Sequence, residues 1–208
     1  MLMNEHDRSN AEGFWAWIAD NVADLRGAGK EAAGGVLDQA AQVLHRYDPF
    51  LGFEISQCND SIELTVTAYG REQSFDSVTK LVESCPTIPG VRVFAFRQPE
   101  GPDFELEIAG RTFSPANVYF EPMKGKADPT SAGLQVFFAR GDDIPIAERL
   151  HVAQIMLQAI LGEYEATTRI DHLEVGDVGE TDVALYIPLS DISAYLSWFE
   201  RRNTRTTQ

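Results

Sequence analysis

Seven side chains of types common in active sites and metal sites lie within one short stretch, LGEYEATTRIDHLEV at 161–175. They are Glu163, Tyr164, Glu165, Arg169, Asp171, His172 and Glu174. Paired carboxylates can serve as a general acid and a general base, and a histidine beside carboxylates can hold a metal ion. The stretch also follows a very apolar helical pattern, so the same residues fit the polar end of a helix that leads into a strand.

A metal site is one hypothesis for this stretch. On a strand, His172 and Glu174 point to one face and Asp171 to the other. Together with Glu163 or Glu165, they would offer ligands for a hard metal ion. The chain has four histidines and two cysteines, and a zinc site usually brings together more of these residues than such a chain easily supplies. A metal-assisted hydrolase centred on His172 is therefore the alternative, and we expect neither a metal nor a cofactor.

The favoured interpretation of 161–175 is structural. Leu161 and Gly162 are expected to end the preceding helix, because glycine tolerates the positive φ of a C-terminal turn. Tyr164 is expected to fold back as an anchor. The apolar residues after it are expected to return the chain to a sheet: Ile170, Leu173 and Val175.

The charged members of the stretch are expected at its rim, where they would contact a basic protein. Because Glu163 and Glu165 would follow a helix C-terminus, the helix dipole would be unfavourable for both carboxylates. That mismatch favours a group that holds them, such as Arg169 or a bound partner. The predicted partner-binding residues are Glu163, Tyr164, Glu165, Asp171, His172 and Glu174.

Other catalytic chemistries lack their residues. No serine stands in a G-x-S-x-G turn between a strand and a helix. Cys58 and Cys85 form no CxxC motif, and neither has a sequence context that would activate a thiol. We therefore expect no catalytic residue.

Net charge is the outlier of the composition. The 208 residues include 32 acidic and 17 basic side chains, a formal charge of −15 at pH 7. Such a field repels nucleic-acid phosphates and anionic membranes and favours a basic protein partner. The N-terminus lacks the apolar run of a signal peptide, and no window approaches the roughly 20 apolar residues of a membrane helix. We expect a cytoplasmic protein that binds neither nucleic acid nor membrane.

Residues 1–49 are predicted to form a helical hairpin. Ser9 and Glu12 have the spacing of a capping box, and apolar residues recur after them at helical spacing. A second helix is expected over roughly 30–47. The Asp48-Pro49 pair ends it, because the residue before a proline disfavours helical torsions.

Residues 50–100 are predicted to form a first β-β-α-β unit. Apolar and polar residues alternate over 51–56 and again over 62–68, the pattern of a half-buried hairpin. A helix is expected over 74–84, followed by the strand VRVFAFR at 91–97. Because this strand is apolar on both faces, we expect it in the interior of the sheet.

Residues 101–178 repeat this order as a second unit. Its expected elements are strands at 104–108, 117–121 and 134–140, a helix over 145–161 and a strand near 168–175. Residues 179–208 add a terminal strand and a helix that starts at Ser190. The prediction is a single α+β domain, 1–208, whose mainly antiparallel sheet is built from two β-β-α-β units.

Three stretches carry a family resemblance: FWAW at 14–17, TAYGREQSFDSVTKLVESCPTIPGVRVFAFRQP at 67–99 and LGEYEATTRIDHLEV at 161–175. They resemble an uncharacterised family of bacterial cytosolic proteins with an aromatic N-terminal helix and a Leu-Gly-Glu-Tyr motif. The resemblance spans most of the chain and implies no activity.

The expected function rests on charge and fold class. Small acidic α+β proteins of bacteria are often immunity proteins or partner-binding modules, which is an analogy alone. We expect a non-catalytic, acidic protein-binding module, immunity-like by that analogy.

Overall fold

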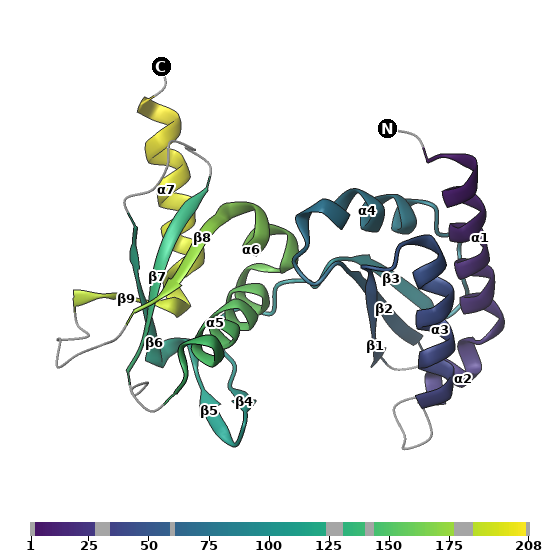
Figure 1. The fold of residues 1–208 in the computed structure, drawn as a ribbon, viewed down its shortest axis with the longest axis horizontal. Coiled ribbons are helices and arrows are strands. Elements are labelled where there is room, and N and C mark those ends of the chain that lie inside the picture. The colour runs from purple at the N-terminus through teal and green to yellow at the C-terminus, as the bar shows by residue number, and fades with distance from the viewer. Residues whose placement is uncertain are drawn as a thin grey trace. The chain divides into compact units, whose positions relative to one another are not determined.

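The computed structural model describes residues 3–27, 34–58, 61–123, 131–139, 144–176 and 185–206. The chain divides into two compact units, Met1–Arg97 and Gln98–Gln208, whose elements are labelled in Figure 1. Both units combine helices with sheets, and four of the six strand pairings among the described residues are antiparallel. The predicted α+β class is therefore confirmed. The division falls close to the predicted boundary between the two β-β-α-β units.

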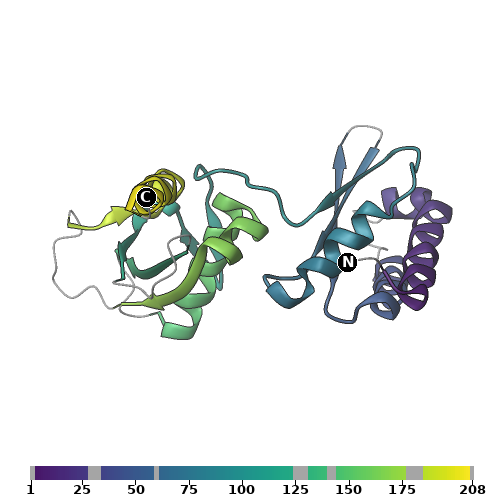
Figure 2. The ribbon, with the colours of Figure 1, turned by 90° about the horizontal axis from the view of Figure 1, so that it is seen from above.

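The first unit begins with three helices, α1 (Glu5–Asp20), α2 (Val22–Gly27) and α3 (Gly34–Tyr47). Asn4 caps α1, since its side-chain oxygen accepts the N–H of Asp7 at 2.8 Å. The capping-box prediction is wrong, because Ser9 and Glu12 lie inside the helix. Figures 1 and 2 both show α3 beside α1, as the predicted helical hairpin requires. Residues 28–33, which include the expected start of the second helix, lie outside the described residues.

The sheet of the first unit has the predicted β-β-α-β order. Strands β1 (Gly52–Cys58) and β2 (Ser61–Thr67) form an antiparallel hairpin. A 3₁₀ turn (Glu72–Ser74) and helix α4 (Phe75–Glu83) then lead to β3 (Val91–Ala95), which pairs parallel with β2. The strand order is β1-β2-β3.

One face of this sheet forms the core of the unit. Alternation along β2 buries Ile62, Leu64 and Val66 completely, and they belong to one apolar cluster with residues of α1 and α4. The indole N–H of Trp15 donates to the carbonyl oxygen of Leu81 at 2.9 Å. That bond ties α1 to α4 within the core.

The position of β3 corrects one prediction. It lies at an edge of the sheet, not in its interior. Phe96, taken as part of the strand's second apolar face, has φ of 65° and so leaves the strand. Its ring then meets Phe75 edge-to-face at a centroid distance of 4.7 Å. A turn of the chain, and not a second covering layer, is what buries this aromatic residue.

The second unit holds two sheets among its described residues. Strands β4 (Leu106–Ile108) and β5 (Arg111–Phe113) form a small hairpin. The other sheet has the order β8-β7-β6-β9. Its strands are β6 (Val118–Pro122), β7 (Ala132–Phe138), β8 (Ile170–Val175) and β9 (Ile187–Pro188).

The helices of this unit lie between and after these strands. Helix α5 (Ile146–Leu161) and the short α6 (Glu163–Arg169) connect β7 to β8. A 3₁₀ turn (Leu189–Asp191) and α7 (Ile192–Thr206) end the chain's described part, and another such turn (Pro115–Asn117) precedes β6. The predicted helix over 145–161 is confirmed. The expected terminal strand, VALYIPL at 183–189, is shorter than predicted: residues 183–184 lie outside the described residues, and only Ile187–Pro188 of the rest form a strand.

The two units share a strand order but not a sheet. In each, an antiparallel hairpin is followed by a helix and a strand parallel to the second hairpin strand. The prediction of one continuous sheet is wrong, because each unit pairs its own strands around its own core. The prediction of a single folding domain stays a prediction. No helix in the described residues has both the length and the apolar character needed to cross a membrane.

Candidate functional site

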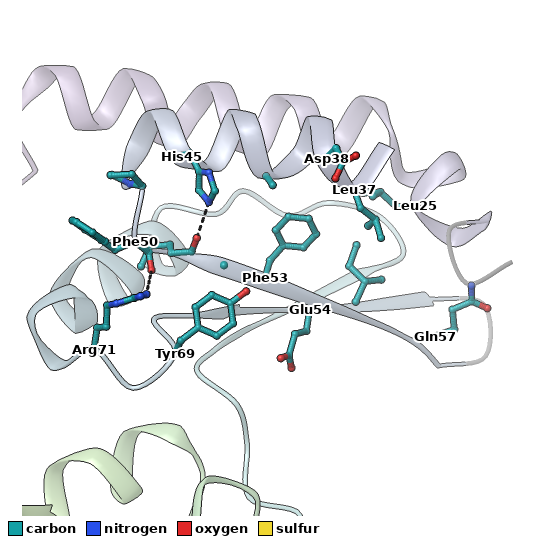
Figure 3. Close-up of a pocket in the computed structure, with 15 residues that line it drawn as sticks. Leu25, Leu37, Asp38, His45, Phe50, Phe53, Glu54, Gln57, Tyr69 and Arg71 are labelled. Atoms are coloured by element: carbon teal, nitrogen blue, oxygen red, sulfur yellow. Dashed lines mark hydrogen bonds between the residues drawn. The ribbon is translucent and has the colours of Figure 1, made fainter. Parts of the chain in front are cut away.

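A groove lies between helix α3 and strand β1 of the first unit, with a cavity volume of about 740 Å³. Figure 3 shows Phe53 pointing toward α3 and Glu54 pointing to the other side of the strand. Leu25, Leu37 and Ile55 extend the apolar lining. The groove exists because α3 leaves part of β1 uncovered, so that Phe53 and Ile55 stay only partly buried.

The hydrogen bonds of β2 show which of its backbone N–H and C=O groups point toward β3 and which point toward β1. In a strand, the N–H and C=O of one residue point to one side and those of the next residue to the other. Ile62 donates its N–H to Gly90 O at 2.9 Å, and Val66 O accepts the N–H of Phe96 at 2.8 Å. Both bonds are on the β3 side of β2. Glu63 and Thr65, which alternate with them, therefore direct their N–H and C=O toward β1.

This alternation leaves a row of backbone groups on the outer edge of β1. Glu54 stands opposite Thr65 in the register, and this pair exchanges the ladder bonds. The neighbouring residues of β1 must then direct N–H and C=O away from β2: Phe53, Ile55 and Gln57. No strand of the described residues pairs with that edge.

His45 forms a hydrogen bond with the carbonyl group of Leu51, the residue just before β1. Its Nε2 lies 3.1 Å from the carbonyl oxygen of Leu51, and Figure 3 shows the ring reaching down from α3. Because a carbonyl can only accept, Nε2 is the protonated nitrogen of this ring. His45 is exposed at the surface and also forms part of the wall of the groove.

Two aromatic side chains stand at one end of the groove. Phe50 and Tyr69 are 58% and 51% exposed, and both line the cavity. The guanidinium carbon of Arg71 lies 5.7 Å from the centroid of the Phe50 ring. A Cβ on Gly52 would come within 2.1 Å of the Tyr69 hydroxyl oxygen, so glycine at this position allows the ring to lie against β1.

The charged residues of the groove are unevenly distributed. His45 and Arg71 lie at the end where β1 begins, whereas Asp38 lies toward the end where β1 finishes (Figure 3). Glu54 points away from α3 and forms an ion pair with Arg97. Arg71 therefore gives one end of the groove a positive charge, and Asp38 gives the other end a negative charge.

The stretch 161–175 lies in the second unit and has a different geometry from the one expected. Gly162 ends α5 with φ of 81°, as predicted. The chain then forms α6, so Glu163 and Glu165 occupy the first turn of a helix and not the end of one. Their position relative to a helix dipole is thus favourable, and the predicted mismatch is wrong.

The predicted rim residues do not all reach the surface. Glu163 is fully buried, so the prediction that it lies at the rim is wrong, whereas its role in partner binding stays a prediction. Tyr164 is 51% exposed, and its expected role as an anchor stays a prediction. Glu165 is exposed and forms an ion pair with Arg169 at 3.1 Å, the partner that we expected for this carboxylate. Asp171 is exposed on β8.

His172 and Glu174 do share one face of a strand, as predicted. Their Nε2 and Oε1 atoms are 2.8 Å apart, and both side chains are about half exposed, at 55% and 49%. Within the described residues, no three histidine, cysteine, aspartate or glutamate side chains gather as metal ligands would. The pair therefore stands as a surface interaction of β8.

Sequence reasoning missed the groove, although part of its signal was present. Asp38 and His45 stand seven residues apart, a spacing that places both on one polar face of α3. The alternation of Leu51, Phe53 and Ile55 marked β1 as a strand with one apolar face. What the pattern could not show is that α3 covers this face incompletely.

Comparison of the chain with models of protein families, with curated proteins and with solved structures found no match. The resemblance to an uncharacterised bacterial family stays a prediction.

Proposed function

We propose that the protein is a non-catalytic binding module that accepts an extended segment of a partner protein along β1. The observation that carries this proposal is the row of outward N–H and C=O groups on Phe53, Ile55 and Gln57, beside an apolar groove. An exposed strand edge pairs readily with another extended chain. Main-chain bonds then supply affinity, and pockets for alternate side chains supply selectivity.

The dimensions of the groove fit such a segment. Seven residues form β1, and a strand rises about 3.4 Å per residue, so the edge is roughly 24 Å long. A bound segment would place every second side chain between the sheet and α3. There it would cover Leu37, Phe53 and Ile55, which are only partly buried without it.

The acidic surplus supports a basic partner. A net charge of −15 attracts cationic proteins over long range and raises their association rate, an effect that salt screens. Glu165, Asp171 and Glu174 would add to this field from the second unit. We place the encounter in the cytoplasm, where the free thiols of Cys58 and Cys85 would stay reduced.

The test uses peptides selected by display of a random twelve-residue library on the full chain. Binding of the selected peptides is measured by fluorescence anisotropy. Ala41→Phe fills the groove from α3, and Gln42→Phe places the same side chain on the exposed next residue, outside the cavity lining. We expect Ala41→Phe to weaken binding at least tenfold and Gln42→Phe to leave it unchanged.

A second pair of variants tests the backbone directly. Gln57→Pro removes one outward N–H but no ladder bond, because proline is tolerated on the free side of an edge strand. Gln57→Ala removes the same side chain and keeps the N–H. Weaker binding by Gln57→Pro alone supports strand addition. Equal binding by all four variants and the wild type would exclude the groove as the binding site.

A further inference from the structure

We infer that the segment bound on β1 is the C-terminal end of the partner, antiparallel to β1, with its α-carboxylate beside Arg71 and His45. This inference rests on the proposed function and adds a direction and an end group to it. Two independent features of the structure support it.

The first feature is the comparison between the two sheets. The hairpin β6–β7 and the parallel strand β8 of the second unit correspond in order to β1–β2 and β3. In that unit, the outer edge of β6 carries an additional strand, β9, which pairs antiparallel with it through Phe120 opposite Ile187. The corresponding edge of β1 has no such strand among the described residues. A bound partner segment, here called the guest, that runs antiparallel to β1 would give the first unit the same four-stranded order.

The second feature is the polarity of charge along the groove. An antiparallel guest ends where β1 begins, near Gly52. That is the end that holds Arg71 and His45, whereas Asp38 lies toward the other end (Figure 3). A free α-carboxylate therefore meets the cationic end only in the antiparallel direction. The direction from sheet topology and the direction from charge agree.

Arg71 has donors left for a carboxylate. One of its Nη atoms lies 3.4 Å from Phe50 O, a long contact that occupies one of the five N–H groups of a guanidinium. The residue is exposed and borders the cavity. Two parallel N–H groups of arginine match the two oxygens of a carboxylate. The side chain of Asp48 accepts the N–H of Phe50 at 2.9 Å.

The distance between the two ends of the groove indicates which side chains the guest should carry at which positions. Asp38 and His45 are seven residues apart on α3, or about 10 Å at 1.5 Å per residue. An extended guest covers that distance in about three residues. The preferred guest therefore has a lysine or arginine about three or four positions before its C-terminal residue. Apolar side chains would alternate with polar ones between these two points.

The probes are two forms of one library-selected peptide, with a free α-carboxylate and with a C-terminal amide. Anisotropy titrations are run with the wild type, Arg71→Gln and Ala41→Phe. We expect the amide to bind the wild type at least tenfold more weakly than the acid. Arg71→Gln should weaken binding of the acid and leave the amide unchanged, so that the two peptides become equal. Asp38→Asn should reduce the preference for a basic residue in a repeated selection.

The outcomes separate the inference from the proposed function. Equal binding of acid and amide to the wild type, with both lost in Ala41→Phe, overturns the end-group inference and leaves strand addition in place. Binding that survives Ala41→Phe overturns both. A selected peptide that prefers the acid form but is insensitive to Arg71→Gln also overturns the inference, because another group would then hold the carboxylate.

Discussion

At the scale of single residues, Tyr47 links α3 to α4 through a hydrogen bond that depends on pH. The hydroxyl of Tyr47 donates to Ser77 O at 3.0 Å. Burial, followed by the charges of Asp7, Asp48 and Asp76, raises the pKa of Tyr47 from 10.0 to about 12. The folded protein therefore favours the neutral phenol, and the unfolded chain ionises first as pH rises.

This shift predicts a fall in stability at high pH. Below pH 10 the phenol is neutral in both states, so the favourable contribution is complete there, and it is lost as pH rises toward 12. Tyr47→Phe lacks the hydrogen bond and should be less stable at pH 8 by about 0.5–1.5 kcal/mol. The difference between the two proteins should narrow between pH 10 and 12. Urea unfolding followed by circular dichroism measures it, and a constant difference across this range would contradict the pKa shift.

At the scale of elements, the short helix α6 changes how the acidic stretch must be tested. Glu165→Lys breaks the ion pair with Arg169 and places a cation in the first turn, so we expect a loss of about 0.5–1 kcal/mol. Glu163→Lys places a charge at a fully buried position and should cost about 3 kcal/mol or more. Asp171→Lys, on the exposed surface of β8, should stay within about 0.5 kcal/mol. Urea unfolding compares the three variants.

These variants also decide which residues can report on a basic partner. A double substitution of Glu163 and Glu165 would confuse loss of folding with loss of binding. Asp171→Lys leaves the fold intact and still reverses a rim charge. If Glu163→Lys proves as mild as Asp171→Lys, the Glu163 side chain is not buried and regains its place among the rim residues.

The sequence predicted where helices and strands lie better than it predicted which strands pair with one another. Half-buried strands alternate apolar and polar residues, so β1 and β2 were identified from residues 51–68 alone. The edge position of β3 was not, because the apolar character of Phe96 reflects a turn onto Phe75 and not a covered strand. The seven residues of α6 were not predicted as a helix, because the chain was expected to pass from Gly162 directly toward the strand. Pairing partners depend on tertiary contacts that no local pattern encodes.

The candidate site shows the same limit. The helix end at Gly162 and the strand at 170–175 were predicted, and so was the shared face of His172 and Glu174. The groove was not predicted, because it depends on the fit between α3 and β1. A histidine on a polar helical stripe carries no sign, in sequence alone, that a carbonyl of a later strand will meet it.

At the scale of the whole molecule, the described residues form two hydrophobic cores. One gathers residues of α1, α4 and the first sheet, and the other gathers residues of α5, α7 and the sheet of the second unit. Corresponding positions exist in the two central strands. Leu64 of β2 and Leu134 of β7 are both fully buried, so they form a matched pair for asking whether the units unfold together.

Leu64→Ala and Leu134→Ala should each destabilise one core by about 2–5 kcal/mol. With separate cores, differential scanning calorimetry of the wild type should show two transitions, and each variant should lower the midpoint of only one. The shift should be several degrees, since about 1 kcal/mol moves a unit of roughly 100 residues by about 4–8 °C. Ile55→Val, a mild change on β1, should lower the same transition as Leu64→Ala and so assign it to the first unit. A single transition that both leucine variants lower equally would instead support the predicted single domain, with the two units unfolding as one.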